Sequence, residues 1–467
     1  MMKKIAFAGL LAIFLTGNAS AQNELNNFTA TGRGGVINTF ATDYQAVGIN
    51  PAILGRSDNA LFAFSIGEIG AGVSSKSLTH EQLNKFIYHS DEKLDSLQKR
   101  EFATAFNNED AFNLNIDIST LAVSTHIPKI GGFAFSNRIR VTGHLGLNKN
   151  ASEILFLGQN APIFQDLQIG DTIGIRRTLN PTFVKMQILN EWNLAYGAEL
   201  ISSPGFKLQA GIGYKLVQGV GVIEIAVDAE NVTAYTALSP KFDVNYGDLV
   251  NDPNFNTTDI GEGFFKPVGK GHGFDLGVAA EIGTKVKASL SVTDIGSIKW
   301  RGNLLTANDQ YIQKTNSDGI ETFDFLEEVI DLAGTGSDSQ FNFSPDSELK
   351  RKLPTKLRTG VGYKLSNTLE AGLDATIPLN DVAGNLEDPF VGLGVDYKVA
   401  EHLKLSSGFS AGAGYGASIP LGFTFVSSMY EFGVATRDLV GLFSTENPYL
   451  SIAFGFLRFK FGSIEAR

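Results

Sequence analysis

Apolar residues alternate with polar or small ones over several segments of about ten residues each. In 206–216, the apolar side chains are Phe206, Leu208, Ala210, Ile212, Tyr214 and Leu216, and lysine, glutamine and glycine lie between them. Segments 357–365, 369–377 and 391–399 repeat this alternation. Because successive side chains of a strand point to opposite faces, each segment is predicted to be a strand with one apolar face. Ten residues is also the length of a strand that crosses a membrane.

We predict a strand in each of fourteen segments. They are 60–74, 112–127, 131–147, 183–202, 206–230, 271–283, 285–299, 356–366, 368–378, 389–400, 402–411, 417–427, 429–437 and 448–461. Tight turns follow the even-numbered strands, whereas the long inserts 75–111, 148–182, 231–270 and 300–355 follow odd-numbered ones. Short turns on one side and long loops on the other are typical of outer-membrane barrels, with the long loops extracellular.

The predicted fold class is therefore all-β, a transmembrane antiparallel β-barrel of about fourteen strands. A soluble β-sandwich would also show alternation, but it would not explain the unequal connections. The even count requires 206–230 to be one long strand, because two strands would give fifteen and move the 231–270 insert to the wrong side. The last strand changes phase between Phe456 and Leu457, which predicts a bulge there. Closing the sheet removes its free edges.

The N-terminus has the pattern of a secretory signal peptide. Lys3 and Lys4 precede an apolar stretch at 5–15, and Ala19-Ser20-Ala21 forms a small-residue cleavage site. We expect residues 1–21 to be the signal peptide, 22–59 an N-terminal plug, or hatch, and 60–467 the barrel. Export by a signal peptide places the barrel in the outer membrane of a Gram-negative cell.

Composition excludes several classes of protein. The sequence contains no cysteine, so neither a lipid anchor on cysteine nor a disulfide framework is available. No stretch after the signal peptide approaches the eighteen apolar residues of a membrane-spanning helix. The 51 glycines and 35 phenylalanines favour many strands. A formal charge of −11 argues against a nucleic-acid partner.

The segment 22–59 lacks strand periodicity and is expected to fill the barrel. Asp43 is a candidate N-cap for a short helical turn, and Pro51 forces Asn50 out of the helical region. The tripeptide Asn50-Pro51-Ala52 therefore marks a sharp turn shortly before the first strand.

This hatch motif, after a signal peptide and ahead of fourteen strands, resembles the FadL-type transporters of hydrophobic compounds and their PorV-like relatives of the Bacteroidetes. The resemblance implies a plugged lumen and a substrate that leaves sideways through a gap in the barrel wall. Asn137, in the lipid-facing phase of 131–147, would put an amide toward hydrocarbon, so a kink or opening near Asn137 or Gly143 is a candidate lateral gap. The alternative is that the Asn137 amide finds hydrogen-bond partners within a wall that has no gap.

Polar residues of the opposite phase are expected to meet in the lumen, where mixed charges can pair and hold the plug. They are Glu199, Lys207, Lys215, Lys356, Arg358, Lys364, Glu370, Asp374, Asp396 and Lys398. Two inserts are predicted to carry helices, one capped by Ser90 or Asp91 and one over 323–333. Nine carboxylates between Asp318 and Glu348 form an acidic stretch that could bridge to lipopolysaccharide through divalent ions or be a solvated surface.

No catalytic, cofactor or metal site is predicted. The six histidines are scattered without zinc-ligand spacing, and no nucleophile elbow follows a strand. The leading functional hypothesis is passive uptake of small hydrophobic molecules, with outer-membrane lipid, lipopolysaccharide and an apolar ligand as partners. The alternatives are a PorV-like barrel that docks partners of a protein secretion system, and a general diffusion porin.

Overall fold

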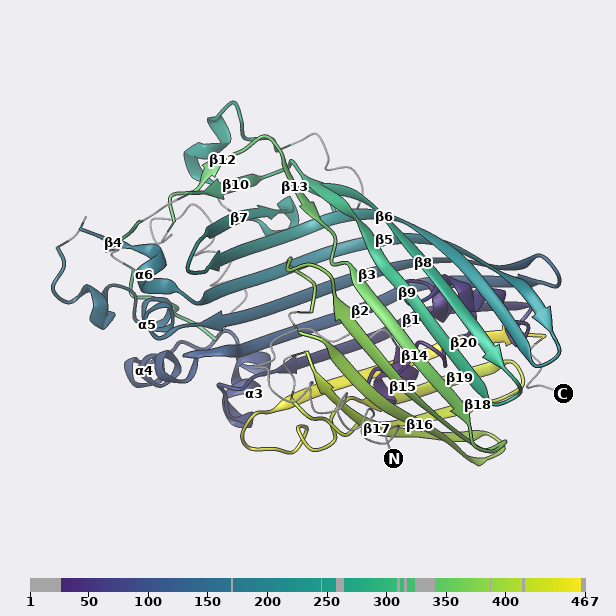
Figure 1. Cartoon of the computed structure of the whole chain (residues 1–467). Coiled ribbons are helices and arrows are strands. Elements are labelled where there is room, and N and C mark those ends of the chain that lie inside the picture. Colours follow the sequence, from purple (N-terminus) through teal and green to yellow (C-terminus); the bar gives the residue numbers. More distant parts are fainter. Residues whose placement is uncertain are drawn as a thin grey trace, which may run out of the picture.

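The chain forms one closed ring of antiparallel strands, and the segment 27–59 lies inside the ring (Figure 1). The computed structural model describes residues 27–168, 171–244, 246–257, 264–308, 311–314, 317–323, 341–386, 388–413 and 416–462. The predicted signal peptide, 1–21, and most of the predicted helix at 323–333 lie outside these residues. Among the described helices, none has the length and hydropathy needed to span a membrane.

Fourteen strands make the barrel, and each pairs with its neighbours in chain order until β20 pairs with β1. They are β1 (Phe62–Ser74), β2 (Asn108–Ile127), β3 (Gly131–Leu147), β5 (Thr182–Ser203), β6 (Phe206–Val227), β8 (Gly269–Ile282), β9 (Val286–Trp300), β14 (Lys356–Lys364), β15 (Leu369–Pro378), β16 (Phe390–Ala400), β17 (Leu403–Gly412), β18 (Leu421–Val426), β19 (Tyr430–Thr436) and β20 (Tyr449–Phe461). The predicted barrel is confirmed, including the interpretation of β6 as one strand of twenty-two residues.

Shorter strands extend the sheet beyond the ring at its extracellular end. β7 (Val232–Leu238) pairs with β6 and β10 (Leu304–Ala307), β12 (Ser344–Pro345) pairs with β10, and β13 (Leu349–Lys352) pairs with β9. β4 (Thr172–Gly174) and β11 (Tyr311–Gln313) form a separate two-stranded sheet. The ring is also uneven, because β5 and β6 have twenty-two residues each and β18 has six. The wall therefore rises higher on the β5–β6 side.

Helices belong to the plug and to the extracellular loops. They are α2 (Phe28–Gly32), η1 (Asp43–Ala46), η2 (Pro51–Gly55), α3 (His80–Tyr88), α4 (Ser96–Ala105), α5 (Lys149–Leu157), η3 (Gly158–Asn160), η4 (Pro162–Phe164), α6 (Ile175–Leu179), η5 (Pro240–Phe242) and η6 (Gly247–Asn251).

The first extracellular insert holds two helices, and neither starts at the predicted cap. α4 is capped by Asp95 instead of Ser90 or Asp91. α3, which was not predicted from the sequence, begins after Thr79. Thr79 and Gln82 form a capping box, the S/T-x-x-E/Q pattern that could have located this helix.

The two faces of the wall differ as the alternation predicts. Ile212, Val361 and Leu393 are half exposed on the outer surface, whereas Lys215 and Asp374 face inward and are buried. The predicted bulge is present, since the β19–β20 register shifts there and Phe456 and Leu457 both point outward. An apolar outer surface around a ring in which the strands hydrogen-bond to one another is what a bilayer requires.

Candidate functional site

Residues 27–59, here called the plug, fill the ring and press directly on its inner wall. Twelve inward-facing glycines on ten strands lie against the plug so closely that an added Cβ would crowd a plug atom. These glycines, here called the glycine belt, are Gly132, Gly197, Gly211, Gly277, Gly360, Gly362, Gly372, Gly392, Gly394, Gly422, Gly433 and Gly455. At Gly211, for example, the added atom would overlap the backbone of Pro51 and Ala52. The fit leaves the plug little room to move.

Charged wall residues hold the plug backbone in place. The Asp374 carboxylate accepts hydrogen bonds from the amide nitrogens of Ile37 (2.6 Å) and Asn38 (2.7 Å). Asp396 forms a 2.8 Å ion pair with Arg33 of the plug. Lys207, also of the predicted lumen set, donates from Nζ to the Ser57 hydroxyl of the plug (2.9 Å). Asp374, Asp396 and Lys207 of this set thus contact the plug.

The hatch motif connects the plug to strands β8 and β9. Asn50 is fully buried and caps η2 by accepting a 3.0 Å hydrogen bond from the Ala52 amide. Its Nδ2 donates to the Val278 carbonyl (2.9 Å) and to the Ser289 hydroxyl (2.8 Å). As predicted from Pro51, Asn50 is extended, with φ −154°. The predicted cap of the preceding turn is wrong by one residue, because Thr42 occupies the N-cap position of η1.

We expect Asn50→Ala to lower the free energy of unfolding by about 1–2 kcal/mol, because the variant loses the η2 cap and leaves buried partners unsatisfied. Urea titration of the protein in liposomes, followed by tryptophan fluorescence, measures this change. Asn367→Ala, in the exposed β14–β15 turn, is the control and should have almost no effect. Equal losses in the two variants would contradict a specific role for Asn50.

Above the plug, the lumen is crossed by buried ion pairs. Lys215 lies 2.5 Å from Asp294 and 3.1 Å from Asp275, and Arg140 lies 2.9 Å from Glu191. Of these residues, only Lys215 belongs to the predicted lumen set. The inward phase of β3 could have indicated Arg140, whereas Asp294 lies at a register shift between β8 and β9 and has a φ of 60°.

The remaining residues of the predicted lumen set occupy separate places. Glu199 pairs with Lys207 at 3.8 Å, and Glu370 lies 3.9 Å from Lys287. Lys356 and Arg358 are buried in the wall. Lys364 and Lys398 line a polar hollow of about 600 Å³ at the periplasmic mouth. The structure thus distributes the set along the whole lumen.

Asp58 lies at the same mouth, beside Arg56 and Lys287. Burial by itself would raise the pKa of the Asp58 carboxyl, but these two cations outweigh it and hold the pKa well below its usual value. The carboxylate therefore remains charged and anchors the end of the plug at neutral pH.

A chain of polar side chains crosses the outward phase of four adjacent strands at Asn137. The Thr120 hydroxyl donates to Asn137 Oδ1 (2.6 Å), and Asn137 Nδ2 donates to Asn190 Oδ1 (2.7 Å). Asn190 Nδ2 donates in turn to Gln218 (2.7 Å). β3 pairs with β2 and β5 at both Asn137 and Gly143, and the β2–β3 register shifts between Ser119 and Leu121. The Asn137 amide is thus satisfied within a paired wall.

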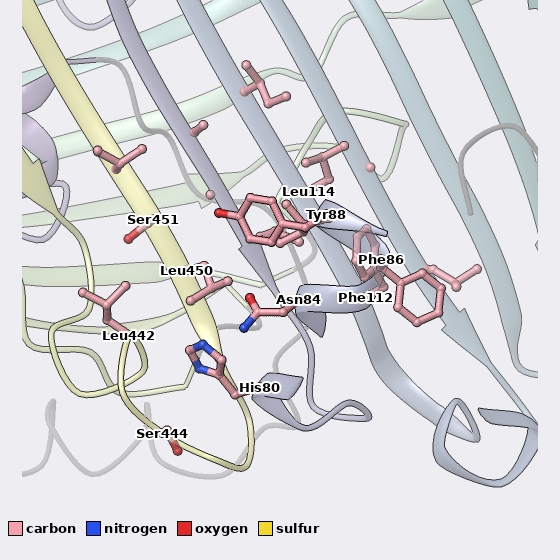
Figure 2. A pocket seen from close by; sticks show the side chains of 18 of the residues that line it. His80, Asn84, Phe86, Tyr88, Phe112, Leu114, Leu442, Ser444, Leu450 and Ser451 are labelled. Carbon is pink, nitrogen blue, oxygen red and sulfur yellow. The ribbon is translucent and has the colours of Figure 1, made fainter. Parts of the chain in front are cut away.

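An apolar groove of about 1210 Å³, here called the α3 groove, lies outside this wall at its extracellular end (Figure 2). Its floor is made by outward-facing residues of β1, β2, β3, β5 and β20, including Leu114, Ile116, Gly143 and Ile452. α3 and the loop 437–448 enclose it, and His80 N donates to the Thr445 carbonyl between them (2.9 Å). The structure therefore brings Gly143 into the groove, whereas Asn137 lies six residues away along β3.

Packing fixes α3 over the groove. Leu83 of α3 is fully buried, and the Phe86 ring contacts Phe102 (5.3 Å between centroids) and Phe323 (5.4 Å). These contacts hold α3 against α4 and Phe323. Phe86 also lines the groove, together with Asn84 and Tyr88 of the same helix (Figure 2).

The sequence model of the family of unknown function DUF5723 matches residues 51–436. The chain belongs to this family. Comparison with curated protein sequences gives no match.

Solved structures similar to the DUF5723 barrel include two toluene transporters and a FadL homologue. The Ralstonia pickettii toluene transporter TbuX has 10% identity and a TM-score of 0.43, over 95% of this chain and 99% of TbuX. The Pseudomonas putida toluene transporter TodX has 11% identity and a TM-score of 0.44, over 95% and 98%. A Pseudomonas aeruginosa FadL homologue has 11% identity and a TM-score of 0.42, over 95% and 99%.

The expected resemblance to FadL-type barrels is found among solved structures, since one of the three is a FadL homologue. The closed ring with an apolar outer surface is an outer-membrane barrel. Identities of 10–11% leave the function to be argued from the geometry of this chain.

Proposed function

We propose that the protein takes up small hydrophobic molecules passively across the outer membrane. The observation that carries this proposal is the α3 groove, which is lined mainly by apolar side chains and lies at the extracellular end of a plugged barrel. Pockets that bind small molecules are mostly apolar and typically have volumes of about 300–1,000 Å³. The groove therefore has the size and chemistry to capture an apolar molecule before it crosses the wall.

The proposal includes passage through the wall rather than along its axis, because the plug and the ion pairs occupy the lumen. Gly143 is on the groove floor, and the amide chain through Asn137 lies below it on the same outward row. When the wall opens, side chains such as Asn137 can exchange one hydrogen-bond partner for another at low cost. Leaving a buried amide without any partner would cost more. Asn137 and Gly143 are thus the proposed lateral gap, and the family resemblance supports this route.

Outer-membrane lipid and lipopolysaccharide are proposed as the surroundings of this route. A docking role in secretion and a general diffusion pore have no specific observation in their favour among the described residues. Two of the similar structures are toluene transporters, which is compatible with an apolar cargo here.

Filling the groove tests the proposal. The dye N-phenyl-1-naphthylamine fluoresces once it reaches phospholipid, so its rate of fluorescence increase in intact cells measures uptake. We expect Gly143→Phe to reduce the rate several-fold, toward that of cells lacking the protein, because the added ring would occupy the groove. Val361→Phe, on the lipid-facing surface of β14, is the matched control and should leave the rate unchanged. Wild-type uptake no faster than that of cells lacking the protein would overturn the proposed function.

The lateral gap has a separate test. We expect Asn137→Leu to impair uptake of the same dye, because leucine cannot re-form the hydrogen bonds to Asn190 and Thr120 when the wall opens and closes. The amount of folded protein in the membrane is measured in parallel. Normal uptake at a normal amount of folded protein would discard a gap at Asn137 while leaving the groove in place.

A further inference from the structure

The floor of the α3 groove is a continuation of the surface that contacts lipid. Ile116 and Ile452 have the same outward phase as the residues below them on β2 and β20. About 9–11 tilted residues of a strand cross the apolar layer of a membrane, and β20 has thirteen. Because Leu450 and Ile452 lie near its extracellular end, the groove is at the outer edge of the apolar layer.

Large apolar side chains project from both sides of the groove. On α3, Tyr88 is 74% exposed and Ile87 is 41% exposed. On the loop 437–448, Phe443 is 77% exposed and Val440 is 60% exposed. Such a concentration of exposed apolar side chains marks a contact surface, and aromatic residues are enriched where a protein meets the membrane interface. Continuity with the lipid-facing wall identifies the partner of this surface as the outer leaflet.

The groove also has a polar end without a cation. His80, Asn84 and Ser444 lie together there, away from Leu114 and Tyr88 (Figure 2). Among the described residues that line the groove, none is lysine or arginine, and the formally charged side chain is Glu81. Lys85 lies 4.0 Å from Glu81 but does not line the groove. A carboxylate or phosphate in this place would therefore lack a cationic partner among the lining residues. Hydroxyl or amide groups could instead form ordinary hydrogen bonds.

We propose that the α3 groove is filled from the outer leaflet by an uncharged molecule with an alkyl chain, whose hydroxyl-type head lies beside His80 and Asn84. This inference rests on the proposed function, because it names the substrate class and the direction from which the same groove is loaded. The chain lies on Ile116 and Ile452, while Phe443 and Tyr88 are immersed in the leaflet. A fatty acid of equal chain length is discriminated against.

Tryptophan quenching by brominated chains tests this assignment without requiring transport. The native tryptophans are Trp192, on the outer wall, and Trp300, which is fully buried. In a Trp192→Phe background, Val440→Trp places a reporter on the exposed part of the loop 437–448, outside the residues that line the groove, and is called the lip reporter. Ile116→Trp places the floor reporter in the groove floor. Leu97→Trp, on the exposed side of α4, is the control for a residue in water.

The proteins are reconstituted in vesicles of unbrominated phosphatidylcholine and titrated with dibromostearyl alcohol or with dibromostearic acid at pH 8. Quenching of the lip reporter measures the concentration of each compound in the membrane, and quenching of the floor reporter measures occupancy of the groove. At equal lip quenching, we expect several-fold stronger floor quenching by the alcohol than by the acid. The Leu97→Trp reporter should respond to aqueous iodide and to neither compound.

Three results would overturn the inference: a lip reporter quenched by iodide alone, a floor reporter unaffected by both compounds, and floor quenching by the acid equal to that by the alcohol. Circular dichroism of each variant verifies that the barrel is folded. If these signals are as expected but the dye uptake of wild-type cells equals that of cells without the protein, the proposed function fails and the binding assignment stands. If dye uptake is normal but the floor reporter is not quenched, the proposed function stands and the binding assignment fails.

Discussion

Replacing Lys215 by methionine is expected to lower the free energy of unfolding by about 3–5 kcal/mol, the typical cost of leaving a buried charge without its partner. Lys215 is 1% exposed and contacts both Asp275 and Asp294, so its removal leaves two carboxylates facing each other inside the lumen. Methionine retains most of the side-chain volume, which restricts the change to charge. Urea titration in liposomes measures the loss.

Two further variants separate this effect from a general loss of charge. Lys207→Met removes the partly exposed pair with Glu199, for which about 0–1 kcal/mol is expected. Adding Asp275→Asn to Lys215→Met should recover part of the stability, because Arg140 remains 3.5 Å from Asp294. Equal losses for Lys215→Met and Lys207→Met would show that the buried cluster has no special role.

Gly211→Ala is expected to displace the plug. The added methyl would overlap the backbone of Pro51 and Ala52, and neither β6 nor η2 can withdraw without breaking its own hydrogen bonds. Overpacking of this kind typically costs about 1–3 kcal/mol. We expect ion conductance in planar bilayers to increase from almost none in the wild type to readily detected channel openings.

The matched control is Gly174→Ala, because an added Cβ at Gly174 would meet no atom within 4 Å. This variant should remain as closed as the wild type. A Gly211→Ala protein with wild-type conductance and stability would mean that the plug yields easily, in contradiction to the tight fit seen along the glycine belt.

The barrel could be predicted from sequence because alternation is a local signal. A bilayer selects apolar side chains on one face of every strand, so residues such as Leu373 and Asp374 reveal their orientation without knowledge of the neighbouring strands. The difference in connection length then fixed which ends are extracellular. Even the single long strand β6 could be inferred from the position of the 231–270 insert.

The α3 groove could not be predicted, because it depends on contacts between distant segments. Its floor comes from five strands, and its roof is held by Thr79, which pairs with Glu446 across most of the chain. Asp294 was missed for a similar reason, since a register shift turns it toward Lys215. The local phase around Asn137 was informative, but only the fold shows which side chains satisfy its amide.

The glycine belt has a consequence for how the molecule is made. Since glycines on ten strands contact the plug closely, the plug has too little space to insert into a barrel that has already closed. It precedes β1 directly in the chain, and β1 and β20 form the final seam. The plug must therefore be in position before β1 and β20 pair, so that the barrel closes around it.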